Sequence, residues 1–159
     1  MSSQNSSIND KPEQTDEQKL NVLFLCTGNT CRSQMAEGLT RHLKSDIIAP
    51  YSAGVDPGEM NLRAVKCMAE ISIDISGGFP KTIESLSNIA FDYVITLCDQ
   101  ANESCPLFPG KTKRLHWGFE DPPKLAENAA TEEEAMSHYR RVRDEIKAFV
   151  EKLPDVLND

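Results

Sequence analysis

The chain has 159 residues, a length that suits one domain, and its composition (39% hydrophobic, 26% charged) is that of an ordinary globular protein. Its formal net charge of −8 argues against nucleic acid or an anionic membrane as a general partner, because both attract basic surfaces. No apolar run approaches the roughly 20 residues of a membrane span, and the N-terminus lacks the apolar segment of a signal peptide. We therefore expect a cytoplasmic protein, in which free thiols persist.

The N-terminal residues are too polar to bury a core. We expect a flexible tail over residues 1–19 and a single domain over residues 20–159. The domain opens with a continuous apolar run at 21–26, which is typical of a strand buried on both faces. A helix follows the next polar segment, and one face of it carries the apolar residues Met35, Ala36, Leu39 and Leu43.

Strand and helix patterns alternate through the middle of the chain. A second strand is expected at 47–52, where Pro50 favours the edge of a sheet. Helical spacing follows over 62–69 and a short helix around 83–89, before a third strand at 91–98.

The C-terminal part predicts a last strand at 113–117 and a long helix at 131–153, which Thr131 and Glu134 open as a capping box. The side chains expected to face the core are Met136, Tyr139, Val142, Ile146, Phe149 and Leu153. We expect the acidic face of this helix to be solvated. Strands that alternate with helices imply an α/β fold, a parallel sheet covered by helices on both faces.

Cys26 and Arg32 form a Cys-x5-Arg pattern between the first strand and the first helix. The pattern alone is weak, but here the cysteine ends a buried strand and the arginine opens a helix. Such a loop turns consecutive backbone N–H groups inward at a helix N-terminus and binds an oxyanion, with Gly28 expected at a positive φ. The predicted oxyanion-binding residues are Thr27, Gly28, Asn29, Thr30, Cys31, Arg32 and Ser33.

Cys26 is the candidate nucleophile, because a helix N-terminus and a nearby cation stabilise a thiolate. Arg32 would grip two oxygens of the oxyanion, Ser33 would donate a hydrogen bond to the Cys26 sulfur, and Asn29 would brace the loop. The alternative is a buried structural cysteine with a surface arginine.

Residues 22–38 (VLFLCTGNTCRSQMAEG) resemble the signature of the low-molecular-weight protein tyrosine phosphatase superfamily, and more specifically of its thioredoxin-coupled arsenate reductase branch. The likeness continues through YSAG at 51–54, DIS at 74–76, TLC at 96–98, CP at 105–106, HWGFEDP at 116–122 and RVRDEI at 141–146. The resemblance implies a single three-layer domain with a four-stranded parallel sheet in the order 2-1-3-4.

The resemblance also implies a redox activity, the reduction of arsenate to arsenite. Cys26 would attack arsenate, Cys98 would attack Cys26 as arsenite leaves, and Cys105 would attack Cys98, so that thioredoxin receives a Cys98–Cys105 disulfide. Asp121 matches the superfamily's general acid, with Glu120 and Asp99 as weaker candidates. The implied partners are an arsenate, phosphate or sulfate oxyanion and thioredoxin, with glutaredoxin left open, and we expect a monomer without a cofactor.

The positions of Cys98 and Cys105 fit this chemistry. Cys98 ends the third strand pattern as Cys26 ends the first, and the carboxyl ends of parallel strands meet at one edge of the sheet. If the residues between Cys98 and Cys105 are helical, the two are separated by about 10.5 Å of rise, whereas a disulfide needs Cα atoms within about 7 Å. We therefore expect this segment to move.

The two other cysteines and a lysine complete the expectations. Cys31 is expected to be a passive part of the loop and Cys67 to pack in the core, and the lack of a Cys-x2-Cys pair argues against zinc. Some relatives bind potassium behind the anion loop through Asn, Glu, Ser and a distal Asp. The first three positions match Asn29, Glu37 and Ser52, but Lys81 stands at the fourth, so we expect its ammonium group to replace the ion and predict no metal.

Two alternative functions remain open. A phosphatase would use Cys26, Arg32 and Asp121 alone. Against it, Gln34 stands where phosphatase relatives usually carry proline, and two prolines follow Asp121 in place of a flanking aromatic residue. A redox sensor or oxyanion-binding module would show thiol oxidation without turnover.

Overall fold

A four-stranded parallel sheet forms the centre of the computed structural model, which describes residues 19–108 and 110–158. Its strands are β1 (Leu20–Cys26), β2 (Ile48–Gly54), β3 (Tyr93–Thr96) and β4 (Lys113–His116). Their order is β2-β1-β3-β4, and every neighbouring pair is parallel, so the predicted topology is confirmed. The tail expected over residues 1–19 falls almost wholly outside the described residues.

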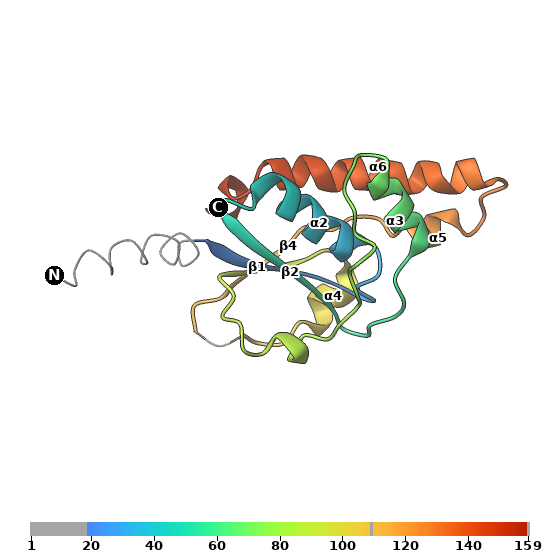
Figure 1. Ribbon diagram of the computed structural model, residues 1–159. Helices are drawn as coiled ribbons and strands as arrows, with labels where there is room; N and C mark the ends of the chain where they lie inside the picture. Colours follow the sequence, from blue (N-terminus) through green and yellow to red (C-terminus); the bar gives the residue numbers. More distant parts are fainter. Residues whose placement is uncertain (1–18, 109, 159) are drawn as a thin grey trace.

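Helices lie on both faces of the sheet, and the larger ones share one face (Figure 1). That face carries α2 (Arg32–Lys44), α3 (Leu62–Ala69) and α6 (Glu132–Glu151). The other face carries α4 (Asp99–Ser104) and the 3-10 turn η1 (Glu84–Leu86). α5 (Pro122–Ala126) packs on α6, and the 3-10 turn η2 (Asp155–Asn158) closes the described chain. Within this described part, no helix has the length and apolar character needed to cross a membrane.

The core forms where the sequence patterns are most regular. The central strand β1 is buried on both faces from Val22 to Leu25, as its continuous apolar run predicts. The apolar face predicted for the long C-terminal helix is confirmed at all six positions from Met136 to Leu153, which are buried. Thr131 caps this helix by accepting a hydrogen bond from the backbone N–H of Glu134.

Several predicted boundaries are wrong. The third strand ends at Thr96 rather than at Cys98, because the chain turns there into α4. The helix expected over 83–89 is only the single turn η1, and α5 was not expected at all, although prolines are favoured in a first helical turn. Leu62, which fits the apolar spacing of α3, is 81% exposed; the buried residues of this helix are Ala64, Cys67 and Met68.

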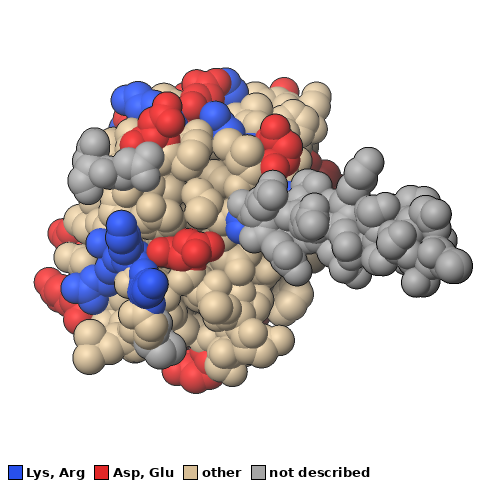
Figure 2. Space-filling view, turned by 90° about the vertical axis from the view of Figure 1, so that its left-hand side faces the viewer, with Lys and Arg blue, Asp and Glu red and all other residues tan. Residues whose placement is uncertain are grey.

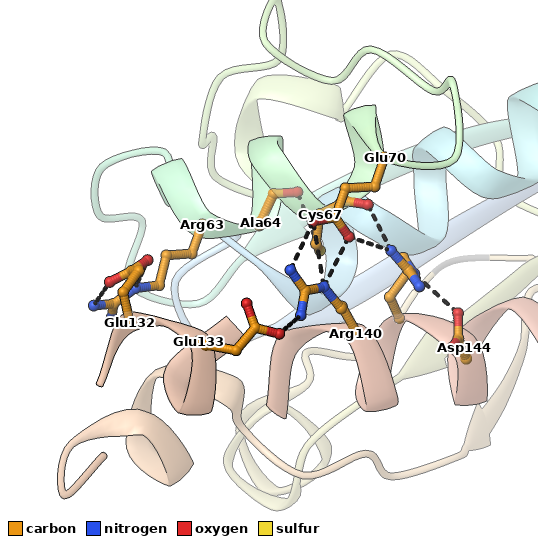
Figure 3. Close-up of polar contacts among 9 residues, drawn as sticks. Arg63, Ala64, Cys67, Glu70, Glu132, Glu133, Arg140 and Asp144 are labelled. Carbon is orange, nitrogen blue, oxygen red and sulfur yellow. Dashed lines mark hydrogen bonds and ion pairs between the residues drawn. The ribbon is translucent and has the colours of Figure 1, made fainter. Parts of the chain in front are cut away.

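A cluster of arginines and acids joins α3 to α6 (Figure 3). The buried Arg143 donates from Nη1 to the Cys67 carbonyl (2.8 Å) and to Glu70 (3.1 Å), and Arg140 binds Glu70 through Nε and Nη2. These hydrogen bonds, with Arg140 as the main donor, hold the pKa of Glu70 below its ordinary value. The acidic residues expected to be only solvated are thus also ion-paired: Glu132, Glu133, Asp144, Glu145 and Glu151.

Replacement of Arg143 by methionine tests this cluster. Methionine keeps most of the packing but removes the donor to the Cys67 carbonyl, and an unsatisfied buried acceptor costs about 1–3 kcal/mol of unfolding free energy. Urea denaturation of Arg143→Met should show a loss in this range. The matched variant Lys147→Met removes only an exposed pair with Glu151 and should cost less than about 0.5 kcal/mol. Equal losses in the two variants would contradict the assigned role.

Candidate active site

The loop between β1 and α2 turns its carbonyl groups outward. The hydrogen bonds that hold them run from Val55 N to Cys26 O (3.2 Å), Asp56 N to Thr27 O (2.9 Å), Gly58 N to Gly28 O (3.0 Å), Gln34 Nε2 to Asn29 O (3.1 Å) and Asn61 N to Thr30 O (3.1 Å). In a trans peptide, a carbonyl and the following N–H point in opposite directions. The N–H groups of residues 27–31 therefore face inward, at the N-terminus of α2, and form the predicted oxyanion cradle.

The residue with positive φ in this loop is Asn29 (φ 56°), so the prediction for Gly28 is wrong. Asparagine is among the few residue types that tolerate this conformation, and here its side chain is fixed at both ends. Its Nδ2 donates to Ser33 Oγ (2.7 Å), and its Oδ1 accepts from the backbone N–H of Lys81 (3.0 Å). Asn29 therefore braces the loop, as predicted, through its side chain.

Gly54 is the glycine that the cradle needs, and sequence reasoning missed it. A Cβ at this position would lie 2.8 Å from the Thr27 carbonyl oxygen and 2.9 Å from the Asn29 nitrogen, both backbone atoms that cannot give way. Gly54 is paired with Cys26 across β1 and β2. The feature of the sequence that could have indicated this requirement is the YSAG segment at 51–54, whose glycine ends β2 beside the end of β1.

The sulfur of Cys26 receives a directed hydrogen bond. Ser33 Oγ lies 2.9 Å from Cys26 Sγ and accepts from Asn29 Nδ2, which leaves the hydroxyl hydrogen free to point at the sulfur. The sulfur of Cys26, just before the N-terminus of α2, thus has a hydrogen-bond donor directed at it.

The neighbouring cysteines lie in apolar surroundings. Burial, and then the charge of Cys26, raise the pKa of the Cys31 thiol well above its ordinary value, so Cys31 remains protonated. Burial likewise raises the pKa of Cys67 to about 11, and its sulfur lies 3.8 Å from that of Met35. Cys67 therefore packs in the core as predicted, and the raised pKa of Cys31 leaves Cys26 as the candidate nucleophile of this loop.

Arg32 connects the cradle to the loop that carries Asp121. Its guanidinium group donates from Nη1 to the Phe119 carbonyl (2.9 Å), and its Nη2 lies 3.5 Å from Asp121 Oδ1. The rings of Trp117 and Phe119 pack on Phe149 of α6, with centroids 4.5 Å and 6.0 Å away. The half-buried carboxyl of Asp121 is therefore held beside Arg32.

Of the weaker acid candidates, Glu120 pairs with Arg141 (2.8 Å) on α6, and Asp99 lies 3.3 Å from Nε2 of His116. The other ring nitrogen of His116 lies 2.8 Å from the hydroxyl of Thr96. His116 thus ties β4 to the first residue of α4.

Cys98 lies next to the cradle. Its sulfur is 3.2 Å from the hydroxyl of Thr27, the residue after Cys26. Cys98 is also the N-cap of α4, and its sulfur accepts a hydrogen bond from the backbone N–H of Ala101 (3.4 Å). Because β1 and β3 are hydrogen-bonded neighbours, the expected proximity of Cys98 to the loop of Cys26 is met.

Cys105 ends the same helix as its C-cap residue. It is half-buried, and all five cysteines are free thiols. The segment between Cys98 and Cys105 is helical, so the condition on which its movement was predicted is fulfilled.

Lys81 lies behind the cradle, against the side chain of Glu37. Its Nζ is 3.9 Å from Glu37 Oε1 and donates to the Phe79 carbonyl (3.3 Å), and Glu37 also binds Arg41 (2.6 Å) and Ser52. Burial lowers the pKa of Lys81, and the charge of Glu37 opposes this shift. The described residues contain no cluster of three or more His, Cys, Asp or Glu side chains suited to a metal ion.

Gln34 supports the cradle from the same side. It is 3% exposed, and its Nε2 donates both to the Asn29 carbonyl and to the Phe79 carbonyl (3.1 Å each). A Cβ on Gly78 would lie 2.5 Å from the Gln34 side-chain oxygen, so a glycine lets this segment approach. Sequence reasoning used Gln34 only to argue against a phosphatase and missed this contact.

The position of Lys81 predicts that the cradle needs no potassium. Phosphate affinity of the wild type, measured by calorimetry, should be the same in potassium and sodium salts of equal ionic strength. Lys81→Met should lower that affinity about tenfold, because it removes a charged donor behind the loop, and potassium should partly restore it. Lys44→Met, at the opposite end of α2 from the cradle, is the control and should change nothing. A wild type that binds phosphate more tightly in potassium would refute the assignment.

Comparison with known proteins places this site in a family. Residues 21–159 match the family model of the low molecular weight phosphotyrosine protein phosphatases. An arsenate reductase of Shouchella clausii is 50% identical over 135 residues, which cover 84% of this chain and 94% of that protein.

Two solved structures extend the comparison. An arsenate reductase in the phosphate-binding state superposes with a TM-score of 0.66 at 31% identity, covering 84% of this chain and 95% of the other. A thioredoxin-dependent arsenate reductase of Corynebacterium glutamicum has a TM-score of 0.65 at 26% identity, over 88% of this chain and 62% of that longer one. The chain belongs to the low molecular weight phosphotyrosine protein phosphatase family.

Proposed function

We propose that this protein reduces arsenate to arsenite, using Cys26, Cys98 and Cys105 in turn and thioredoxin as the source of electrons. The observation that carries the proposal is the contact of the Cys98 sulfur with Thr27, which brings a second thiol to the rim of the cradle. A hydrolytic phosphatase needs only one cysteine. The arsenate reductases among the relatives support the same conclusion.

In the first step, the inward N–H groups of the cradle and the guanidinium of Arg32 bind arsenate, a tetrahedral oxyanion. The Cys26 thiolate attacks arsenic and forms a sulfur–arsenic bond. An oxygen leaves as water, and Asp121, held beside Arg32, supplies a proton to it. Arsenic is still in its +5 state at this point.

In the second step, the Cys98 thiolate attacks the Cys26 sulfur. The electron pair of the sulfur–arsenic bond leaves with arsenic, which becomes arsenite in the +3 state, and a Cys26–Cys98 disulfide forms. The two sulfurs have lost the two electrons that arsenic gained. The Thr27 hydroxyl lies 3.2 Å from the Cys98 sulfur and the Ala101 N–H donates to it at 3.4 Å, so these contacts hold the sulfur at the rim of the cradle.

In the third step, the Cys105 thiolate attacks the Cys98 sulfur and releases the Cys26 thiolate. Because α4 separates Cys98 from Cys105 by about 10.5 Å of rise, this helix must unwind for the disulfide to form. The two thiols of thioredoxin then reduce the Cys98–Cys105 disulfide by exchange. This chemistry needs a reducing compartment, which agrees with the cytoplasm, and we expect a monomer to perform it.

The same cradle, with Arg32 and Asp121, also suits hydrolysis of an aryl phosphate, which uses Cys26 but neither Cys98 nor Cys105. We therefore expect a weak phosphatase activity beside the reduction. It provides a readout of the cradle that is independent of the relay.

Cys98→Ser separates the two activities. With thioredoxin, thioredoxin reductase and NADPH, arsenate-dependent loss of NADPH should fall to background, because no neighbouring thiol can attack the Cys26 sulfur and release arsenite. Hydrolysis of p-nitrophenyl phosphate should continue. Cys26→Ser should abolish both activities, and Cys105→Ser should release about one arsenite per protein before it stops. Normal arsenate reduction by Cys98→Ser would end the relay proposal.

Unwinding of α4 can be followed by amide hydrogen exchange. Residues 99–104 should exchange faster in the protein oxidised by arsenate than in the reduced protein, because their helical hydrogen bonds are lost. The Cys105→Ser variant, which forms the first disulfide but cannot close the second, should show a smaller increase after one turnover, because α4 loses its cap but is not forced to unwind. Unchanged protection of α4 in the oxidised wild type would contradict the predicted movement.

A further inference from the structure

The chain that follows Cys105 presents an apolar side chain at a fixed place on the surface. Leu107 is 97% exposed, the highest value for any large hydrophobic side chain in the described part of the chain. Its neighbour Phe108 is half-buried, with its ring centroid 6.2 Å from that of Phe91, which in turn packs on Tyr51 at 5.4 Å. The packing of Phe108 therefore fixes the position of the adjacent Leu107 on the surface.

A group of basic residues follows Phe108 along the chain and extends into β4. Lys111, Lys113 and Arg114 are all exposed, and no ion pair to a carboxylate of the described residues is present for any of them. Most of the other arginines bind acidic side chains, as in the α3–α6 cluster. Figure 2, which looks at this side of the molecule, shows Lys and Arg side chains gathered together among scattered acidic ones.

This basic group is joined to the cysteine that reacts last. Arg114 Nη1 donates to the carbonyl of Cys105 at 3.5 Å, so the end of α4 and the start of β4 are in contact. β4 is the outer strand of the sheet, and no strand of the described residues pairs with its other edge. Arg114 thus lies beside Cys105, with Leu107 two residues further along the chain and Lys111 and Lys113 in the segment that leads to Arg114.

We propose that Leu107, Lys111, Lys113 and Arg114 form the docking surface for the electron donor, an acidic dithiol protein of the thioredoxin class. This inference rests on the proposed function and names the surface that its last step uses. Unpaired cations on a protein with a net charge of −8 attract an acidic partner and orient it as it approaches. Leu107 then supplies apolar contact area beside the disulfide.

The location also fits the movement that the relay requires. The surface lies outside residues 99–104, and Phe108, beside Leu107, packs on Phe91 rather than on α4. The partner can therefore stay bound while α4 unwinds and refolds. Exchange with its dithiol opens the Cys98–Cys105 disulfide to two thiols and leaves a disulfide on the partner, so two electrons and two protons are transferred.

Steady-state kinetics with an acidic thioredoxin test this surface. The double variant Lys111→Glu/Lys113→Glu should raise the KM for thioredoxin about tenfold at low ionic strength and should weaken its dependence on salt. Leu107→Ser should also raise this KM severalfold but leave the salt dependence unchanged. Matched controls on α3 are Lys66→Glu and Leu62→Ser, equally exposed changes far from Cys105, which should leave the KM unaltered.

Turnover driven by dithiothreitol keeps this test distinct from that of the proposed function. All variants should reduce arsenate at the wild-type rate with this small dithiol, which needs no docking surface. Loss of arsenate reduction in the wild type would overturn the proposed function itself. An unchanged KM for thioredoxin in both Leu107→Ser and the double variant, or an equal rise in the α3 controls, would overturn the docking surface alone.

Discussion

The site depends on the outward orientation of the carbonyl groups of residues 26–30. Peptide planarity makes this orientation decisive, because each carbonyl that is held outward directs the next N–H into the cradle. Four of the five carbonyls accept from backbone N–H groups of residues 55–61, and the fifth accepts from the Gln34 side chain. An acidic protein can in this way bind an oxyanion without a basic surface, since the positive potential comes from aligned backbone dipoles and one arginine.

Chain segments on three sides of the cradle hold its loop in this conformation. Asn61 connects the segment over 55–61 to α6, because its N–H binds Thr30 and its Nδ2 donates to the Tyr139 hydroxyl (3.0 Å). Lys81 and Gln34 act from behind, and the aromatic packing of Trp117 and Phe119 on α6 holds the loop of Asp121 in front. α6 therefore contributes to a site that it does not itself enter.

The sequence predicted what depends on local pattern. The strand before Cys26, the helix after Arg32 and the apolar face of α6 follow from periodicity, and the order of the strands followed from a family resemblance. It failed where distant segments decide the conformation. The positive φ fell on Asn29 rather than Gly28 because Lys81 and Gln34 hold Asn29, and the need for Gly54 arises only when β2 lies against the loop. Neither contact leaves a local pattern.

The weakness of α4 is itself suited to the relay. Six residues are too few for a helix that is stable alone, and only Ala101 of this helix is buried. Its N-terminus is capped by the Cys98 sulfur, which accepts the Ala101 N–H well as a thiolate and poorly once it is bonded to another sulfur. The formation of the first disulfide therefore removes the cap. The first disulfide thus weakens α4 one step before the Cys98–Cys105 disulfide requires it to unwind. The contacts of Asp99 with His116, of Gln100 with Thr27 and of Asn102 with Thr96 oppose this unwinding.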